Sequence, residues 1–152
     1  MKKLGITMLL VGIAFLSGCT SYKEMDSPSL KMFQEQVGKT VPGVTSLETV
    51  THPTRLLFRY TFGTEPDITV QQDIVKRTDG YICTETFETE VLASYYASYN
   101  KKDRIPPDIV LSMDTDGDGE ANFEYYASFG KEGGWSWWYS DYKSMHTEVI
   151  LP

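Results

Sequence analysis

The segment "TRLLFRYTF", residues 54–62, indicates the architecture, because a large apolar side chain stands at every second position. The apolar set that one side of an extended chain would carry is Leu56, Phe58, Tyr60 and Phe62. The set on the other side is Arg55, Leu57, Arg59 and Thr61. Successive side chains of a strand point to opposite faces of its sheet. The segment is therefore predicted to be a strand with one face in the core.

The same period of two begins at Val44 and continues downstream of this strand. The segments "ITVQQDIVKR", residues 68–77, and "YICTETFE", residues 81–88, are rich in β-branched and aromatic residues. Asp79 and Gly80 stand between them, and an Asp-Gly pair between two such runs is typical of a tight hairpin turn. We expect an antiparallel meander in which each strand has polar positions on one face.

Two segments show helical spacing instead. In "SPSLKMFQEQVGK", residues 27–39, Ser27 suits the N-cap, Pro28 the first helical position and Gly38 the end. Its apolar stripe is Leu30, Phe33 and Val37. In "ETEVLASYYASYNKK", residues 88–102, the stripe at i, i+3, i+4 and i+7 is Leu92, Tyr95, Tyr96 and Tyr99. Such a stripe is typical of core packing rather than of a ligand site.

The carboxyl-terminal half contains four more segments with strand character, which are "DIVLSM", "NFEYYASF", "WSWWYSDYK" and "HTEVILP". Together with the upstream elements they predict an α+β fold, predominantly an antiparallel β-sheet of about eight strands with two short helices. Residues 27–152 suit a single domain, because domains commonly hold about 100–200 residues.

The first residues have the pattern of an export signal. Lys2 and Lys3 form a short cationic region, and residues 4–16 form an uncharged apolar run of 13 residues. A membrane-spanning helix needs about 20 apolar residues, so this run is too short to span. Small residues follow it, as in a cleavage site. Residues 1–18 are therefore predicted to be a cleaved signal peptide.

The residues Leu16, Ser17, Gly18 and Cys19 resemble the lipobox of bacterial lipoproteins. The resemblance covers only the signal region, and it implies diacylglycerol transfer to Cys19, cleavage before it and acylation of the new amino terminus. Residues 19–26 would then form a lipidated tether to the bilayer, because several acyl chains anchor a protein stably. Thr20 stands where the inner-membrane retention signal has Asp, which favours an outer-membrane location facing the periplasm in a Gram-negative cell. An ordinary secretory signal is the alternative.

The net charge of the chain argues against nucleic acid as a partner. The chain has a net charge of −7, and loss of the two signal-peptide lysines lowers this to about −9. An acidic protein is a poor nucleic-acid binder, because phosphate contacts need Lys and Arg.

With Cys19 lipidated, Cys83 has no cysteine partner within the chain. Strand alternation would place Cys83 with Tyr81 and Phe87 on one face, buried as a small apolar side chain.

The acidic segment "SMDTDGDGEANFEYY", residues 112–126, predicts a calcium site. Asp114, Asp116 and Asp118 occupy positions 1, 3 and 5 of the pattern D-x-D-x-D-G, with glycine at position 6. Calcium takes six to eight oxygen ligands, and carboxylates at alternate positions of a tight turn can converge on one point. Glu120 would add its carbonyl oxygen, and Asn122 at position 9 the last side-chain oxygen. A metal-free acidic turn is the alternative.

The loop departs from an EF-hand in two ways. Position 12 is Tyr125 instead of the bidentate Glu, and Glu124 lies at position 11. Pro106 and Pro107 leave no room for an entering helix. The loop is more similar to the D-x-D-x-D-G loops between strands of secreted bacterial proteins. That resemblance implies a structural Ca²⁺ of modest affinity, about 10⁻⁴–10⁻³ M.

The aromatic segment "GGWSWWYSDY", residues 133–142, is a second candidate site. As a strand it would direct Trp135 and Trp137 to one face, and Trp138 and Tyr142 to the other. Exposed Trp135, Trp138 or Tyr142 could contact a glycan or an envelope protein. The alternative is that both faces are covered.

Signals of an enzyme are poor. His52 and His146 are far apart in sequence, and the chain has no nucleophile elbow, zinc-protease or C-x-x-C motif. We therefore expect no catalytic residues and a non-catalytic binding or structural module of the cell envelope. A recognition module using residues 135–142 is one alternative. A cell-wall-directed hydrolase using Cys83 or carboxylates is another.

Overall fold

The computed structural model describes residues 22–151, so the predicted signal peptide and Cys19 lie outside the described residues. Its centre is one seven-stranded sheet whose strands lie side by side in chain order. The strands are β1 Lys23–Glu24, β2 Val44–His52, β3 Arg55–Phe62, β4 Asp108–Asp114, β5 Phe123–Phe129, β6 Trp135–Ser140 and β7 Thr147–Val149. Strand β1 falls within the segment expected to be a tether.

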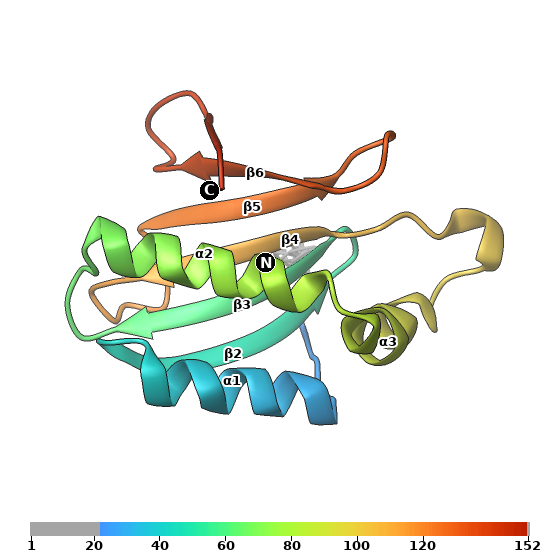
Figure 1. Ribbon diagram of the computed structural model, residues 1–152, viewed down its shortest axis with the longest axis horizontal. Coiled ribbons are helices and arrows are strands. Elements are labelled where there is room, and N and C mark those ends of the chain that lie inside the picture. The colour runs from blue at the N-terminus through green and yellow to red at the C-terminus, as the bar shows by residue number, and fades with distance from the viewer. Residues whose placement is uncertain (1–21, 152) are drawn as a thin grey trace, which may run out of the picture.

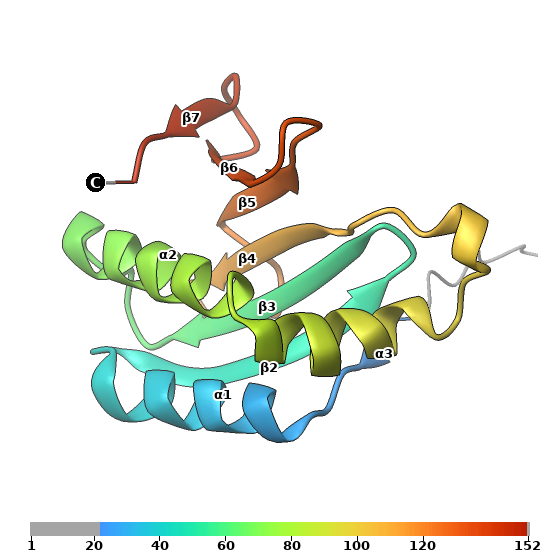
Figure 2. The same cartoon turned by 45° about the vertical axis from the view of Figure 1, so that its right-hand side comes forward.

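Three helices, α1 Pro28–Thr40, α2 Ile68–Ile82 and α3 Ala93–Tyr96, pack on the same face of the sheet (Figures 1 and 2). A π-helical turn, η1 Phe87–Leu92, leads directly into α3, and a short 3₁₀ turn, η2 Lys101–Asp103, follows it. We call the side of the sheet under these helices the helix-covered face. Within residues 22–151, none of the helices is long and apolar enough to cross a bilayer.

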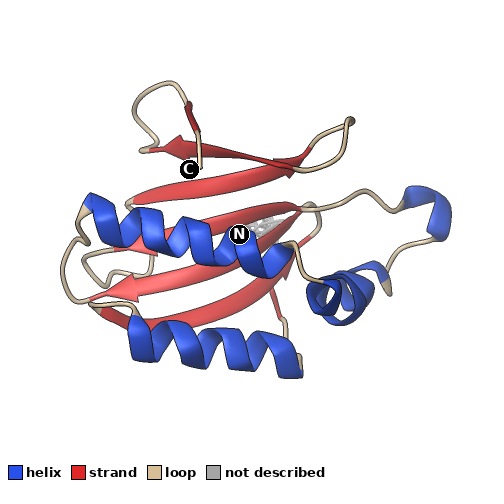
Figure 3. Ribbon diagram, viewed as in Figure 1, coloured by secondary structure: helices blue, strands red, loops and turns tan. Residues whose placement is uncertain are grey.

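Strand β3 lies near the middle of the sheet, and its predicted alternation is confirmed. Leu56 and Phe58 are fully buried and Tyr60 nearly so, all on the helix-covered face. Burying one large apolar side chain stabilises a fold by about 1.5–3 kcal/mol. The core is therefore built on this strand, and the helices of residues 22–151 lie on one side of it (Figure 3).

Helix α1 is also confirmed. The Ser27 hydroxyl oxygen accepts a hydrogen bond from the Leu30 backbone N–H at 3.2 Å, as an N-cap does. Leu30, Phe33 and Val37 are all buried against the sheet. The helix continues two residues beyond Gly38, to Thr40. Only its end was misplaced.

The two strands and the hairpin expected around Asp79 and Gly80 are wrong. Residues from Ile68 to Ile82 form α2 instead, and Gly80 lies inside its last turn. Asp67 caps the helix, because its carboxylate accepts from the backbone N–H groups two and three residues further on at 2.9 and 3.0 Å. Cys83, which the strand pattern placed in the core, follows the helix and is exposed.

The second predicted helix is confirmed as helical structure over η1 and α3. Tyr95 is buried, and Leu92, Tyr96 and Tyr99 pack partly buried against the core. The Tyr95 and Tyr99 hydroxyls both donate to the Pro53 carbonyl at 2.7 Å, which ties this segment to the β2–β3 turn. The tyrosine stripe is thus a packing surface, as its spacing predicted.

The helices between β3 and β4 change the direction of the chain. Because the chain crosses back over the sheet, β3 and β4 pair in parallel, and every other neighbouring pair is antiparallel. The predicted class, α+β with a mostly antiparallel sheet, is confirmed. The predicted counts of about eight strands and two helices differ from the seven strands and three α-helices of residues 22–151, since residues 68–82 are helical.

The opposite side of the sheet, which we call the uncovered face, carries the alternate set of side chains. Register places Arg59 beside Ser112 of β4, and Ser112 beside Glu124 of β5. The loop from β6 to β7 reaches this row, since the Tyr142 hydroxyl donates to Glu124 at 3.0 Å. Charged and polar groups that would be costly in the core are gathered here.

Candidate metal centre

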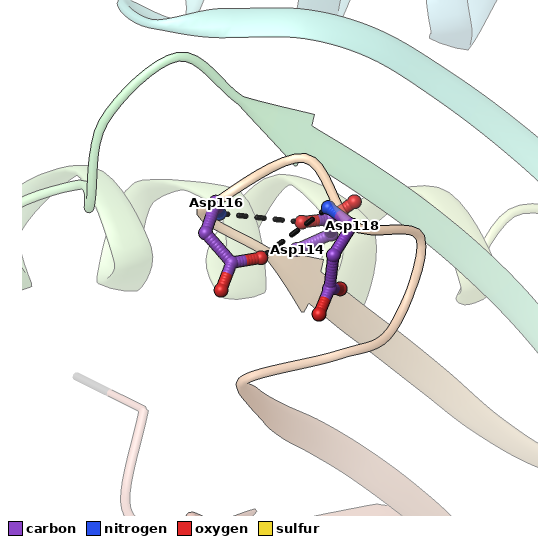
Figure 4. A group of neighbouring side chains, drawn as sticks. All are labelled: Asp114, Asp116 and Asp118. Atoms are coloured by element: carbon purple, nitrogen blue, oxygen red, sulfur yellow. Dashed lines mark hydrogen bonds between the residues drawn. The ribbon is translucent and has the colours of Figure 1, made fainter.

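Three carboxylates converge in the loop that joins β4 to β5. Asp114 is the last residue of β4, and Asp116 and Asp118 follow in the turn (Figure 4). One carboxylate oxygen from each residue lies within 4.8 Å of the other two. The alternate spacing in the sequence therefore becomes a cluster in space that could hold a metal ion, which confirms that part of the prediction.

The loop takes this shape because its first aspartate binds the backbone that follows. The two carboxylate oxygens of Asp114 accept from the N–H groups of Asp116, Gly117 and Gly119 at 3.3, 2.7 and 3.1 Å. Asp114 is only 8% exposed, so these bonds replace water that the carboxylate has lost. The chain is thereby curled around the carboxylate.

Glycine permits two bends that the curl requires. Gly117 has a φ of 77° and Gly119 a φ of 91°, in the region that side chains with a Cβ rarely adopt. The space around both residues is open, so the backbone conformation rather than crowding selects glycine there. The glycine at loop position 6 thus has the role that its place in the pattern predicted.

The electrostatics of the loop favour a bound cation. Three carboxylates this close repel one another, and their repulsion falls when a cation sits among them. Hydrogen bonds from Asn122 and Asp118 hold the pKa of Asp116 below its ordinary value. This carboxylate therefore stays ionised and able to bind metal near neutral pH.

Glu120 and Asn122 complete the predicted ligand set, and their roles stay predictions. The Asn122 side-chain oxygen accepts from the Thr115 backbone N–H at 2.6 Å and from the Thr115 hydroxyl at 2.8 Å. Its amide nitrogen donates to Asp116 at 3.3 Å. Asn122 thus braces the loop across its mouth. The Glu120 backbone N–H donates to Asp118 at 2.8 Å.

The two residues that break the EF-hand pattern point away from the loop in opposite directions. Tyr125 lies on the helix-covered face, where its hydroxyl donates to Gln71 at 2.8 Å. Glu124 lies on the uncovered face and accepts from Tyr142. Neither belongs to the carboxylate cluster.

Arg59 is a site residue that sequence reasoning missed. One of its guanidinium nitrogens donates to the Gly119 carbonyl of the acidic loop at 3.1 Å. Arg59 and Asp114 also line the same depression, of about 260 Å³. The alternation of β3 had placed Arg59 on the polar face, but only the parallel pairing with β4 brings it to this loop.

The aromatic residues of β6 and the following loop divide between the two faces, as alternation predicted. Trp137 is buried on the helix-covered face, where its indole N–H donates to Asp79 at 2.8 Å. Trp135 is partly buried on the same side. Trp138 is half-buried and Tyr142 is 54% exposed on the uncovered side.

Each of the two histidines lies beside a tyrosine ring. His146 shares a hydrogen bond with the Tyr126 hydroxyl at 2.6 Å, and His52 packs beside the Tyr22 ring at 5.8 Å between ring centroids. Partial desolvation raises the pKa of the exposed Cys83 thiol, and the nearby Asp79 carboxylate adds to the rise. A raised pKa lowers the thiolate fraction on which cysteine nucleophilicity depends.

The chain matches no protein-family model, no curated protein and no solved structure. Its own residues therefore carry the functional argument.

Proposed function

We propose that this protein is a membrane-anchored envelope lipoprotein whose domain is a non-catalytic binding or structural module braced by one calcium ion. The observation that carries the calcium proposal is the approach of Asp114, Asp116 and Asp118 to within 4.8 Å of one another. Calcium suits the site better than magnesium, because calcium tolerates irregular oxygen geometry and magnesium demands a near-ideal octahedron. Glu120 would add its carbonyl oxygen to the ligand set. Asn122 would add its side-chain oxygen once that oxygen leaves Thr115 and the amide turns toward the cluster.

The ion would act as a staple for the β4–β5 hairpin. The Asn122 backbone N–H donates to the Met113 carbonyl at 2.8 Å, and this bond closes the base of the loop. It lies next to the pairing of Met113 with Phe123, the last pair of β4 and β5 before the loop. A cation shared by the three aspartates resists opening of this loop. It thereby holds the register of two strands, where a slip of one residue would send every side chain to the wrong face.

Calorimetry and thermal unfolding with calcium test the staple. At about 10 mM calcium, a dissociation constant of about 10⁻⁴–10⁻³ M would add about 1.4–2.7 kcal/mol to stability. Asp116→Asn should remove most of this gain. Asp103→Asn, a change of equal charge in η2, should keep it. Absence of both calcium heat and calcium stabilisation in the parent protein would contradict the proposal.

The anchoring proposal rests on the lipobox resemblance at Cys19. Expression in a Gram-negative host with labelled palmitate should give a labelled protein in the outer-membrane fraction. Cys19→Ala should abolish the label and release the protein from membranes. Label retained by Cys19→Ala would refute lipidation at this residue.

A recognition role for the aromatic strand is the second candidate, and the surroundings of Trp135 favour it. Trp135 lines a cleft of about 720 Å³ between the β5–β6 hairpin and the segment from Cys83 to Tyr96. Its ring packs edge-on against Phe129, which is 49% exposed. Aromatic walls of this kind suit a glycan or a protein side chain.

Trp135→Ala tests this role through pull-down of envelope glycans and proteins. It should reduce capture if the cleft binds. Trp138→Ala is the matched control, because Trp138 belongs to the other face. Equal capture by the parent and Trp135→Ala would remove this candidate.

A further inference from the structure

The uncovered face contains a groove that is separate from the Trp135 cleft and that borders the acidic loop. Its volume is about 460 Å³. The floor is formed by Arg55, Leu57 and Arg59 of β3 with Glu124 of β5, and Tyr22 and Tyr142 stand at its sides. The remaining wall is residues 119–121 of the acidic loop. The groove therefore joins four segments that are far apart in sequence.

Two guanidinium groups in the groove keep most of their hydrogen-bonding capacity. Arg59 donates to one backbone carbonyl and, among residues 22–151, has no carboxylate oxygen within 4.0 Å. Arg55 forms a long ion pair with Glu124 at 4.0 Å, without a hydrogen bond between them, and its side chain is 47% exposed. A guanidinium binds a carboxylate through two parallel N–H···O bonds. In an acidic protein, such a pair of arginines is suited to an anionic ligand.

The other polar group of the floor suits a hydroxylated ligand. The Glu124 side chain is 10% exposed, and one of its oxygens accepts from the Tyr142 hydroxyl at 3.0 Å. A carboxylate accepts several hydrogen bonds, so Glu124 can also accept from ligand hydroxyl groups. Hydroxyl recognition and carboxylate recognition are thus placed side by side.

Two tyrosine rings give the groove flat apolar sides. Tyr22 is 57% exposed and Tyr142 is 54% exposed. Tyr142 also has a φ of 59°, the one left-handed backbone conformation among non-glycine residues of the described chain. For a bulky residue this conformation is strained and is found where surrounding contacts enforce it. The Tyr142 ring is thus held at the groove by a strained backbone conformation.

We propose that the groove binds a sugar acid, with Arg55 and Arg59 holding its carboxylate, Glu124 accepting from its hydroxyls, and Tyr22 and Tyr142 contacting the apolar faces of its ring. This inference rests on the proposed role as a binding module and names its ligand class.

Calcium should strengthen this binding, because the acidic loop shares both a wall and Arg59 with the groove. Without a cation, Asp114 in the neighbouring depression attracts the Arg59 guanidinium and competes with a ligand carboxylate. A bound cation neutralises part of the loop charge and holds the wall at residues 119–121. The two sites are then coupled through Arg59 and its bond to Gly119.

Calorimetric titration of the full-length chain in detergent, with calcium present, tests the proposal. Glucuronate is the probe, glucose lacks its carboxylate and propionate lacks its ring. We expect glucuronate to bind about tenfold or more tightly than either control. The double variant Arg55→Gln/Arg59→Gln should weaken glucuronate binding about tenfold or more. Arg77→Gln, on α2 and paired with Asp73, lies outside the groove and outside the Trp135 cleft, and it should not. Thermal unfolding of each variant verifies its fold.

Each outcome separates the groove from the calcium staple. If the protein binds calcium but does not bind glucuronate, the proposed ligand of the groove is wrong and the calcium proposal stands. Propionate binding as tightly as glucuronate overturns the sugar acid. Glucuronate binding that changes by less than about fivefold on removal of calcium overturns the coupling alone. If the arginine variants bind glucuronate normally, the site is not this groove.

Discussion

Two loops of this protein begin with an aspartate that curls the backbone in the same way, yet only one gathers further carboxylates. Asp114 accepts from the N–H groups two and three residues ahead at 3.3 and 2.7 Å. Asp141, in the β6–β7 loop, accepts from the corresponding N–H groups of Lys143 and Ser144 at 2.9 and 2.8 Å. Both are turns closed by an aspartate side chain.

The difference lies at the alternate positions. After Asp114 the residues two and four further on are Asp116 and Asp118, whereas after Asp141 they are Lys143 and Met145. The Asp141 loop shows that one carboxylate suffices to close the turn. The two additional acids of the Asp114 loop are therefore not required by the turn itself, and their convergence favours a cation.

Neutralising the first aspartate of each loop should separate turn formation from metal binding most strongly. Asp114→Asn replaces one buried acceptor of backbone N–H groups with an NH₂ group, so we expect a loss of about 1.5–3 kcal/mol by urea unfolding. Calorimetry should show loss of calcium binding as well. Asp141→Asn should leave calcium binding unchanged. If both variants lower the calcium affinity, the two loops do not differ in their contribution to calcium binding.

Replacement of Gly119 by alanine should give the next largest loss of stability. Gly119→Ala forces a Cβ into a φ of 91°, so it should cost about 1–2 kcal/mol in thermal unfolding although the space there is open. Gly80→Ala is the control, because Gly80 lies in α2 without positive φ and has equally open space. It should stabilise by about 0.5–1 kcal/mol. Destabilisation by Gly80→Ala would contradict its helical environment.

The hydroxyl that ties the Asp141 loop to the sheet should contribute less. Tyr142→Phe removes the bond to Glu124 and should cost about 1 kcal/mol by urea unfolding. Calcium affinity should not change, since Glu124 is outside the carboxylate cluster. A calcium effect of Tyr142→Phe would show that the two loops are coupled through the sheet.

The smallest effect is an acid transition confined to the Asp141 loop. Hydrogen bonds from the N–H groups of Lys143 and Ser144 lower the pKa of Asp141 to about 2. Because the pKa of an unfolded aspartate is about 3.9, this stabilisation is complete above that pH and is lost as the pH falls toward about 2. The amide resonances of Lys143 and Ser144 should follow this titration. Asp141→Asn should remove it, and persistence of the transition would assign it elsewhere.

The elements predicted correctly are those in which local chemistry and tertiary packing agree. Ser27 and Pro28 begin α1 through contacts within a few residues. The alternation of β3 and the acidic spacing after β4 are likewise readable from neighbouring positions. A carboxylate cluster built within one turn needs little information from the rest of the chain.

Helix α2 was missed because its helical signal is mixed with strand chemistry. Its buried positions, Gln71, Ile74, Val75, Thr78 and Ile82, have helical spacing, but two are polar and the segment is rich in β-branched residues. Gln71 can be buried because Tyr125, far along the chain, donates to it at 2.8 Å. The Asp67 cap was the local signal that could have identified the helix.

The sequence alone determined the α+β class, the central strand, the first helix and the acidic cluster, because short-range periodicity and side-chain–backbone bonds define them. The tertiary structure alone decided that residues 68–82 cross the sheet as a helix and that β3 pairs in parallel with β4. It also decided that one sheet face has no helix over it within residues 22–151. These depend on contacts between distant segments. The meeting of Arg59 with the acidic loop follows from that pairing and from no local pattern.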